Sequence, residues 1–272
     1  MKLFDSLTHV TRDGSWCGER RYDATLARLL QDMDEADVYR ACLVAIADYV
    51  DNEVIIESAR AHPERFVPIA GLNPRTLPTL RRVEAVVAEL AAQGFAGIKL
   101  HPRLNGYDPL DAKCIAVFDA AAEHGLVILL DTLFRRRGLA TTNAPDTIDY
   151  IANACPDTRI LLLHAAGPSM LDLFEIVRAN PNLMLDFSFT LMRYAGSRLD
   201  EDMRYLFSTT DQLITIGSDF PEYPPARILE RFALLSEGIE AHRVENIMYR
   251  NLERLFAGYR VPATQPNRQP AG

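Results

Sequence analysis

The stretch Leu213-Ile214-Thr215-Ile216-Gly217-Ser218-Asp219-Phe220-Pro221 is an apolar run that ends in one acidic residue, at the point where a turn begins. Three other apolar runs also end in a residue that can bind a metal or transfer a proton, namely His9, His101 and His164. Side chains at the carboxyl ends of parallel strands converge on one pocket in α/β folds. The pattern therefore predicts a parallel α/β fold in which these distant residues share a pocket.

Apolar runs alternate with helical patterns along most of the chain, and the runs are short and rich in Val, Ile or Leu. Such runs are typical of parallel strands that are buried on both faces. The strand candidates are residues 2–9, 41–46, 66–72, 97–101, 126–131, 160–164, 183–187 and 213–218. Strand followed by helix, repeated in this way, predicts a single-domain (β/α)8 TIM barrel over residues 1–257. A doubly wound open sheet is the alternative, disfavoured because no Gly-rich phosphate loop follows the first strand.

The composition limits the kinds of partner that we expect. The chain has 272 residues, 48% of them hydrophobic, and a formal net charge of −8, which argues against a nucleic-acid surface. No apolar run approaches the roughly 20 residues that span a bilayer, and the first residues lack a signal-peptide core. We therefore expect a cytoplasmic protein without membrane contact. The Pro-rich polar tail, residues 258–272, is expected to be flexible.

The geometry of strands and barrels predicts which of the candidate side chains meet. Side chains alternate along a strand, so Lys99 lies one layer below His101 on the same face. Closure of the barrel places the eighth strand beside the first, and we expect Asp219 and His9 to be neighbours. Lys99 either serves this site or pairs with a carboxylate such as Asp131 inside the barrel.

Five short pieces of the chain, taken in order, resemble a known family. They are Phe4-Asp5-Ser6-Leu7-Thr8-His9, Gly97-Ile98-Lys99-Leu100-His101-Pro102, Leu162-Leu163-His164-Ala165-Ala166-Gly167, Gly217-Ser218-Asp219-Phe220-Pro221 and Asn251-Leu252-Glu253-Arg254-Leu255-Phe256. The chain resembles the amidohydrolase superfamily, in the amidohydrolase-related branch that also holds the carboxymuconate-semialdehyde-type decarboxylases. The resemblance covers residues 2–256.

The resemblance implies a set of metal-binding residues that this chain keeps only in part. The family carries His-x-His on the first strand, a His at the end of the fifth, a His after the sixth and an Asp after the eighth. Here Leu7 stands at the first His and Asp131 at the fifth-strand His, whereas His9, His164 and Asp219 match. His9, Asp131 and Asp219 are then candidate ligands of one divalent metal, Zn or Mn. A site without metal stays open, because metal-independent lactonases exist in the wider superfamily.

The expected function is hydrolysis of a small carboxylated lactone, ester or amide. Asp219 would activate water, His164 would polarise the carbonyl or donate a proton, and Lys99 would stabilise the oxyanion. A metal-dependent decarboxylase of the same superfamily and a ligand-binding barrel without catalysis are the alternatives, and a homodimer is left open. The residues expected to bind the substrate, which we expect to be anionic, are His101, Arg135, Arg136, Trp16 and Tyr223.

Overall fold

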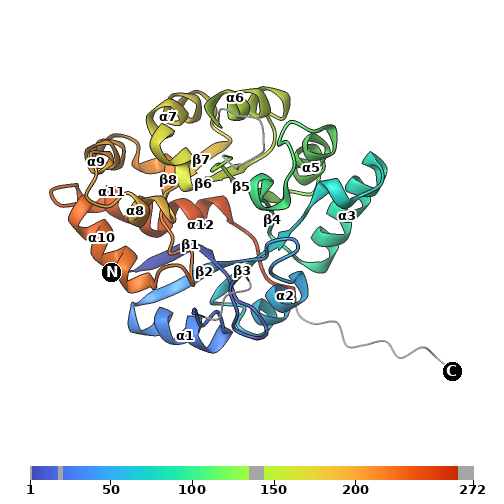
Figure 1. Cartoon of the computed structure of the whole chain (residues 1–272). Coiled ribbons are helices and arrows are strands. Elements are labelled where there is room, and N and C mark those ends of the chain that lie inside the picture. Colours follow the sequence, from blue (N-terminus) through green and yellow to red (C-terminus); the bar gives the residue numbers. More distant parts are fainter. Residues whose placement is uncertain (1, 18–20, 135–143, 263–272) are drawn as a thin grey trace.

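Eight parallel strands form a barrel in the computed structural model, which describes residues 2–17, 21–134 and 144–262 (Figure 1). The strands follow one another around the sheet in chain order, and the eighth returns to the first. Closure is made by the Asp219 amide, which donates to the Leu7 carbonyl at 2.9 Å, and by a parallel bridge between Thr8 and Phe220. The strands are β1 (Leu3–Thr8), β2 (Val38–Val44), β3 (Phe66–Gly71), β4 (Gly97–Leu100), β5 (Val127–Asp131), β6 (Ile160–Leu163), β7 (Leu183–Asp186) and β8 (Ile214–Thr215). The predicted TIM barrel is thus confirmed.

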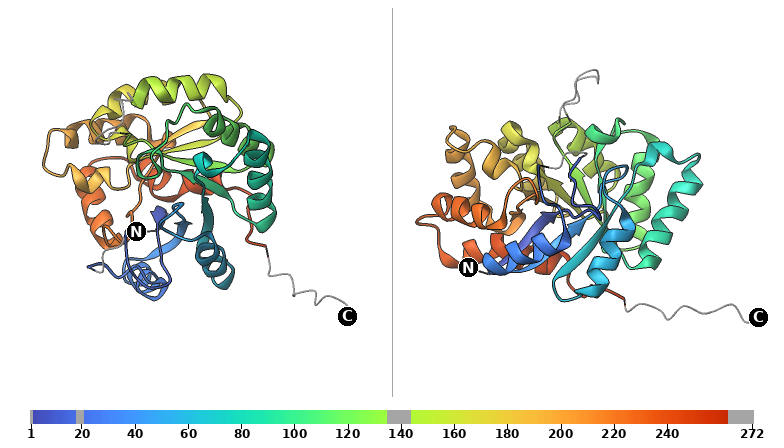
Figure 2. Two further views of the ribbon diagram at one scale, coloured as in Figure 1. Left: turned by 45° about the vertical axis from the view of Figure 1, so that its right-hand side comes forward. Right: turned by 60° about the horizontal axis from the view of Figure 1, so that its bottom comes forward.

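The longer helices lie around the outside of the strands (Figure 1, Figure 2). They are α1 (Leu26–Glu35), α2 (Asn52–Ala61), α3 (Leu80–Gln93), α5 (Ala112–Glu123), α6 (Ala144–Ala154), α7 (Met170–Ala179), α9 (Leu199–Thr209) and α10 (Pro225–Leu235). Shorter segments are α4 (Pro102–Asn105), α8 (Thr190–Arg193), α11 (Ala241–Glu245), the π-helical turn η4 (Asn246–Arg250) and α12 (Asn251–Leu255), with 3-10 turns η1 (Pro74–Thr76), η2 (His164–Ser169) and η3 (Asp211–Leu213). In the described part of the chain, no helix is long and apolar enough to cross a bilayer.

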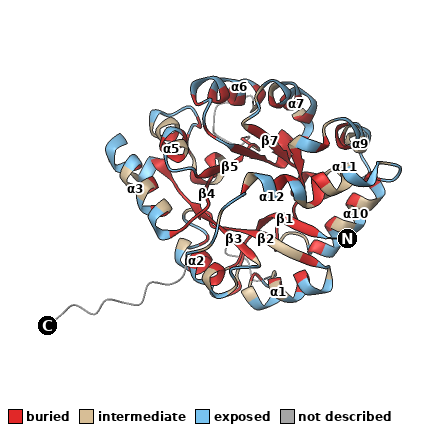
Figure 3. Cartoon of the chain, turned by 180° about the vertical axis from the view of Figure 1, so that it is seen from behind, coloured by how far each residue is buried: buried red, intermediate tan, exposed pale blue. Residues whose placement is uncertain are grey.

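Two apolar layers hold the barrel together. One lies between the strands and the helices, whose inward faces are buried while their outward faces are exposed (Figure 3). The other contains alternate strand residues, such as Val127 and Leu129 of β5, and it also takes in Leu252 and Phe256 at the last helix. The ring of Phe256 lies 6.4 Å from that of Phe4 at the start of β1, so α12 closes the amino-terminal end of the barrel. The opposite end is left for a site.

The predicted tail begins with residues that pack on the barrel. The Tyr259 hydroxyl donates to the carbonyl of Gly94, and Val261 packs against the core. Residues 263–272 lie outside the described residues, so the expected flexibility of the tail stays a prediction.

Strand β1 departs from regular alternation. Its pairing with β2 shifts register twice, and both Phe4 and Leu7 belong to the inner apolar layer. The buried carboxylate of Asp5 accepts from the amides of Leu7 at 3.1 Å and Ser218 at 2.9 Å, while its Oδ2 has no partner among the described residues. Burial raises the pKa of Asp5 to about 7. This carboxyl is therefore protonated in mildly acidic solution.

The replacement Asp5→Asn is expected to reduce the loss of stability between pH 5 and pH 8. The folded state binds the Asp5 proton more tightly than the unfolded state, so the protonated carboxyl contributes to the free energy of unfolding. This contribution is fully present below pH 3.8 and is lost as the pH rises through about 7. Asn cannot ionise, and the melting temperature of the variant should fall less, with each kcal/mol worth about 2–4 °C. Thermal unfolding at the two pH values checks this, with the exposed Asp157→Asn as control. Equal losses in Asp5→Asn and wild type would contradict it.

Candidate active site

A cavity of about 230 Å³ lies at the carboxyl ends of the strands. His9 follows β1, His101 follows β4, His164 follows β6 and Asp219 lies beyond β8, and all four line the cavity. One water occupies ~30 Å³ in the liquid, so this cavity has room for roughly eight waters, the size of a small molecule. The lining side chains are His9, Trp16, Cys17, Ile46, Lys99, His101, Arg103, Leu104, Leu133, His164, Phe189, Asp219 and Glu222.

The backbone around this cavity adopts conformations that most residues avoid. Asp219 has φ of 54°, His164 of 65° and Phe189 of 60°, all in the left-handed region. Each such residue costs on the order of 1–3 kcal/mol and persists only where the surroundings hold it. Cys17, with φ of 49°, also lines this cavity, so several residues in the left-handed region lie around it.

Asp219 and His9 lie side by side, as barrel closure predicts. His9 Nε2 is 3.4 Å from Asp219 Oδ1, and the short contact of 2.6 Å from His9 Nδ1 to the Val44 carbonyl fixes Nδ1 as a protonated nitrogen. Burial lowers the pKa of His9 despite both acceptors, so its Nε2 is free to take a proton. Burial alone would raise the pKa of Asp219, but its contacts with His9 and His164 lower it. The pair is a carboxylate and a neutral imidazole that together can accept one proton.

A second group joins two imidazoles through one carboxylate. Asp131 Oδ2 lies 3.3 Å from His101 Nε2 and 3.2 Å from His164 Nε2, with the Arg103 guanidinium at 3.8 Å. These contacts place the Asp131 carboxylate among three groups that can carry a positive charge. The attraction lowers the pKa of Asp131 well below its ordinary value, although burial alone would raise it.

The two imidazoles that share Asp131 differ in charge. His101 Nδ1 accepts from the Leu104 amide at 3.5 Å, which suits a neutral ring, and burial lowers the pKa of His101 to about 3. His164 Nδ1 instead faces the Ser188 carbonyl at 2.9 Å, so both of its nitrogens face acceptors. Burial alone would lower the pKa of His164, but the Asp131 carboxylate raises it. The contact with Asp131 therefore favours the protonated form of His164.

The donor set does not fit the divalent metal that the sequence leaves open. Leu7 is fully buried in the inner apolar layer, and Asp131 is fully buried behind the two imidazoles without lining the cavity. His9 is engaged by Asp219 and the Val44 carbonyl. Residues 2–17, 21–134 and 144–262 contain no group of three or more His, Cys, Asp or Glu that could hold a metal ion. The set His9, Asp131 and Asp219 is thus not gathered around one point.

Lys99 reaches the cavity without a partner. It is 2% exposed and lies on β4 opposite Leu129 of the inner layer. The ion pair with a carboxylate such as Asp131, one of the two alternatives from the sequence, is absent among the described residues, and the amine makes no hydrogen bond with any of them. Burial lowers the pKa of Lys99, although Asp131 and Asp219 act in the opposite direction.

Only some of the residues expected from the sequence to bind the substrate line the cavity. Trp16 lines the cavity, stacks on His9 at 4.9 Å and donates from Nε1 to Glu222 at 2.7 Å. Tyr223 does not line the cavity, and its ring lies 6.1 Å from that of Phe189, which does. Arg135 and Arg136 lie outside the described residues.

Among the lining residues that sequence reasoning missed are Arg103, Phe189 and Glu222, whose side chains are charged or aromatic. Each follows the carboxyl end of a strand within a few residues, which is the signal that could have found them. Glu222 is held by Trp16 and by the Tyr22 hydroxyl, at 2.9 Å.

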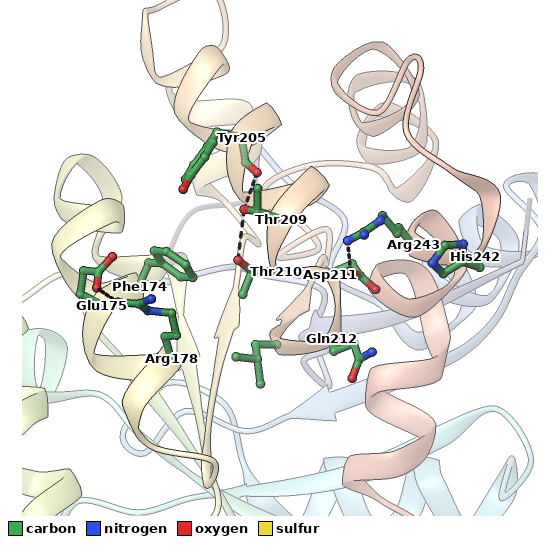
Figure 4. A pocket seen from close by; sticks show the side chains of 11 residues that line it. Phe174, Glu175, Arg178, Tyr205, Thr209, Thr210, Asp211, Gln212, His242 and Arg243 are labelled. Atoms are coloured by element: carbon green, nitrogen blue, oxygen red, sulfur yellow. Dashed lines mark hydrogen bonds and ion pairs between the residues drawn. The ribbon is translucent and has the colours of Figure 1, made fainter.

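A larger cavity of about 660 Å³ lies elsewhere (Figure 4). Its residues Asp211–Leu213 precede β8, so it belongs to the amino-terminal side of the barrel, away from the usual active-site end. Its charges are largely paired, with Arg243 at 2.7 Å from Asp211 and Arg178 at 2.6 Å from Glu175. The smaller cavity is the candidate active site.

A (β/α)8 barrel with acidic and basic side chains gathered at the carboxyl ends of its strands has the arrangement of a TIM-barrel enzyme. The chain belongs to the amidohydrolase family, whose model, described as Amidohydrolase, matches residues 14–257. A comparison with curated protein sequences finds no significant match.

Solved structures share the fold at low sequence identity. An uncharacterized TIM-barrel protein from Bordetella bronchiseptica is 18% identical with a TM-score of 0.79, over 94% of this chain and 99% of that one. An amidohydrolase from Burkholderia multivorans with bound zinc is 14% identical, with a TM-score of 0.69 over 94% and 99%. A 5-carboxyvanillate decarboxylase from Novosphingobium aromaticivorans, complexed with manganese, is 13% identical, with a TM-score of 0.67 over 93% and 96%. At these identities the likeness concerns the fold alone.

Proposed function

We propose that this amidohydrolase-family protein is a hydrolase for a small carboxylated ester, lactone or amide. One observation carries the proposal: a carboxylate with a lowered pKa, Asp219, and an imidazolium with a raised pKa, His164, line the same small cavity. Environments that shift the pKa values of two neighbouring groups in opposite directions supply a base and an acid at the same pH.

The proposed reaction uses these two groups in turn. Asp219, with His9 beside it, takes a proton from a water as that water attacks the carbonyl carbon. The positive charge of His164 stabilises the oxyanion, and Lys99 adds to it while protonated. His164, whose protonated form the Asp131 carboxylate favours, donates its proton to the leaving group.

A divalent metal and decarboxylation form the second candidate. The Burkholderia relative binds zinc and the Novosphingobium decarboxylase is complexed with manganese. The residues of this cavity do not fit such a metal, because Leu7 contributes no donor and Asp131 does not line the cavity. A barrel that binds a ligand without turnover is the third candidate.

The test is a panel of small esters, lactones and amides, each with and without a carboxylate. We expect hydrolysis, with the carboxylated member preferred by about ten- to a hundredfold, since one charge-assisted hydrogen bond is worth roughly 1.5–3 kcal/mol. Binding without turnover across the panel would contradict the proposal and favour the ligand-binding barrel. Release of CO2 from carboxylated members without hydrolysis would favour the decarboxylase.

A further inference from the structure

The chain uses lysine rarely, and one of its lysines is unlike the others. Of the 29 Lys and Arg residues only three are lysine, at positions 2, 99 and 113. The amine of Lys2 pairs with Glu253 at 3.1 Å on the surface, and that of Lys113 donates to the Leu77 carbonyl at 2.6 Å. Lys99 alone among them is buried in a cavity, and its amine has no partner among the described residues.

The chemistry of an amine differs from that of the arginine that this chain uses elsewhere. An arginine would stay charged and bind a carboxylate through two hydrogen bonds, whereas a buried lysine can lose its proton. An amine that has lost its proton and makes no hydrogen bond has a free lone pair and is a nucleophile toward carbonyl groups. The burial of Lys99 and its lowered pKa both favour this form.

We propose that Lys99 forms an imine with the carbonyl group of a small oxo-carboxylic acid bound in the cavity. The amine lone pair forms a C–N bond to the carbonyl carbon, the carbonyl oxygen is protonated to a hydroxyl, and that hydroxyl leaves as water when the C=N bond forms. Hydrolysis of the imine returns the amine and the oxo acid, and no oxidant or reductant takes part. This activity goes beyond the proposed hydrolysis and uses the same cavity.

The neighbours of Lys99 suit such a ligand. His164 and Arg103 line the cavity, and both are positively charged groups that can hold a carboxylate. Asp219 also lines it and can carry the protons that formation and loss of the hydroxyl require. With about 230 Å³, the cavity suits an oxo acid of a few carbon atoms.

The experiment traps the imine by reduction. The full-length protein is incubated with pyruvate or acetoacetate and sodium cyanoborohydride, and intact mass and peptide mapping locate the adduct. We expect one adduct per chain, at Lys99, saturating with the oxo acid, and labelling by acetone, which lacks the carboxylate, at least about tenfold slower. Lys2 and Lys113 serve as controls within the same molecule. Absence of label at Lys99, or equal labelling of the three lysines, would overturn the proposal.

A matched variant separates imine formation from the positive charge. Lys99→Arg keeps the cation but cannot form an imine, so it should lose the adduct and retain part of any hydrolysis. Thermal unfolding reports whether the variant is folded. The labelling of Lys99 in the wild type is a test that does not depend on the variant. Because trapping is read without turnover, failure of the hydrolysis panel and failure of imine formation are observed separately.

Discussion

Replacing Asp219 with Asn is expected to lower kcat/KM for the best substrate of the hydrolysis panel by about 10³-fold, since general bases typically contribute 10²–10⁴-fold. Asn has nearly the shape of Asp but cannot accept the proton of water. Residue 219 has φ of 54°, a conformation that Asn tolerates better than most residues, so the turn should keep its geometry. Alanine would remove the base and strain the turn at once, which makes it the poorer probe.

The measurement is steady-state kinetics of Asp219→Asn beside the exposed Asp157→Asn, together with thermal unfolding of both. We expect the first variant to lose turnover at an almost unchanged melting temperature, and the second to match the wild type. Turnover by Asp219→Asn within a few-fold of the wild type would remove Asp219 from the base role.

The replacement Asp131→Asn is expected to lower kcat/KM at pH 7 by about 10²-fold and to change its pH dependence, because an acid of this kind typically contributes 10²–10⁴-fold. Asp131 raises the pKa of His164, and without it burial dominates and lowers that pKa. At neutral pH most His164 would then lack its proton. Asp131 itself does not line the cavity, so the loss does not come from a substrate contact of its own.

The pH profile distinguishes this role from a structural one. The limb on which activity falls with rising pH should move to lower pH in Asp131→Asn, with partial recovery of activity near pH 5. The stability of the protein should also fall with rising pH through this group. The raised pKa of His164 favours the folded state below pH 6.5, and this contribution is lost as the pH rises through the pKa of His164 in the folded state. A profile reduced equally at every pH would contradict an effect through His164.

The barrel could be predicted from the sequence because each buried strand is marked by its own apolar run. The predicted strand ends are wrong where the apolar run and the strand do not coincide. Strand β2 starts at Val38, three residues before its apolar run, because Tyr39 and Arg40 are only partly buried and break that pattern. The helical segment from Ala241 to Leu255 has a π-helical turn in its middle, which no spacing of apolar residues signals.

The site could be predicted only as far as backbone topology decides it. Closure of the barrel brings Asp219 to His9, and that neighbourhood follows from the order of the strands. The sharing of Asp131 by two imidazoles depends on side-chain directions after the strand ends, which alternation does not specify. It also could not be predicted that the Lys99 amine has no partner among the described residues, since the same spacing allowed an ion pair inside the barrel.

We expect Asp219 and His164 to activate water and the carbonyl without a metal ion. This claim is tested most directly by hydrolysis kinetics of protein freed of metal by a chelator, with elemental analysis of the same sample and readdition of Zn or Mn. We predict that the treated sample holds far less than one ion per chain and that its kcat/KM changes by no more than about twofold when either metal is added. A metal-activated water would instead lower the activation barrier by several kcal/mol, and its loss would be easily seen. An inactive stripped protein that regains turnover with one ion per chain would contradict the claim.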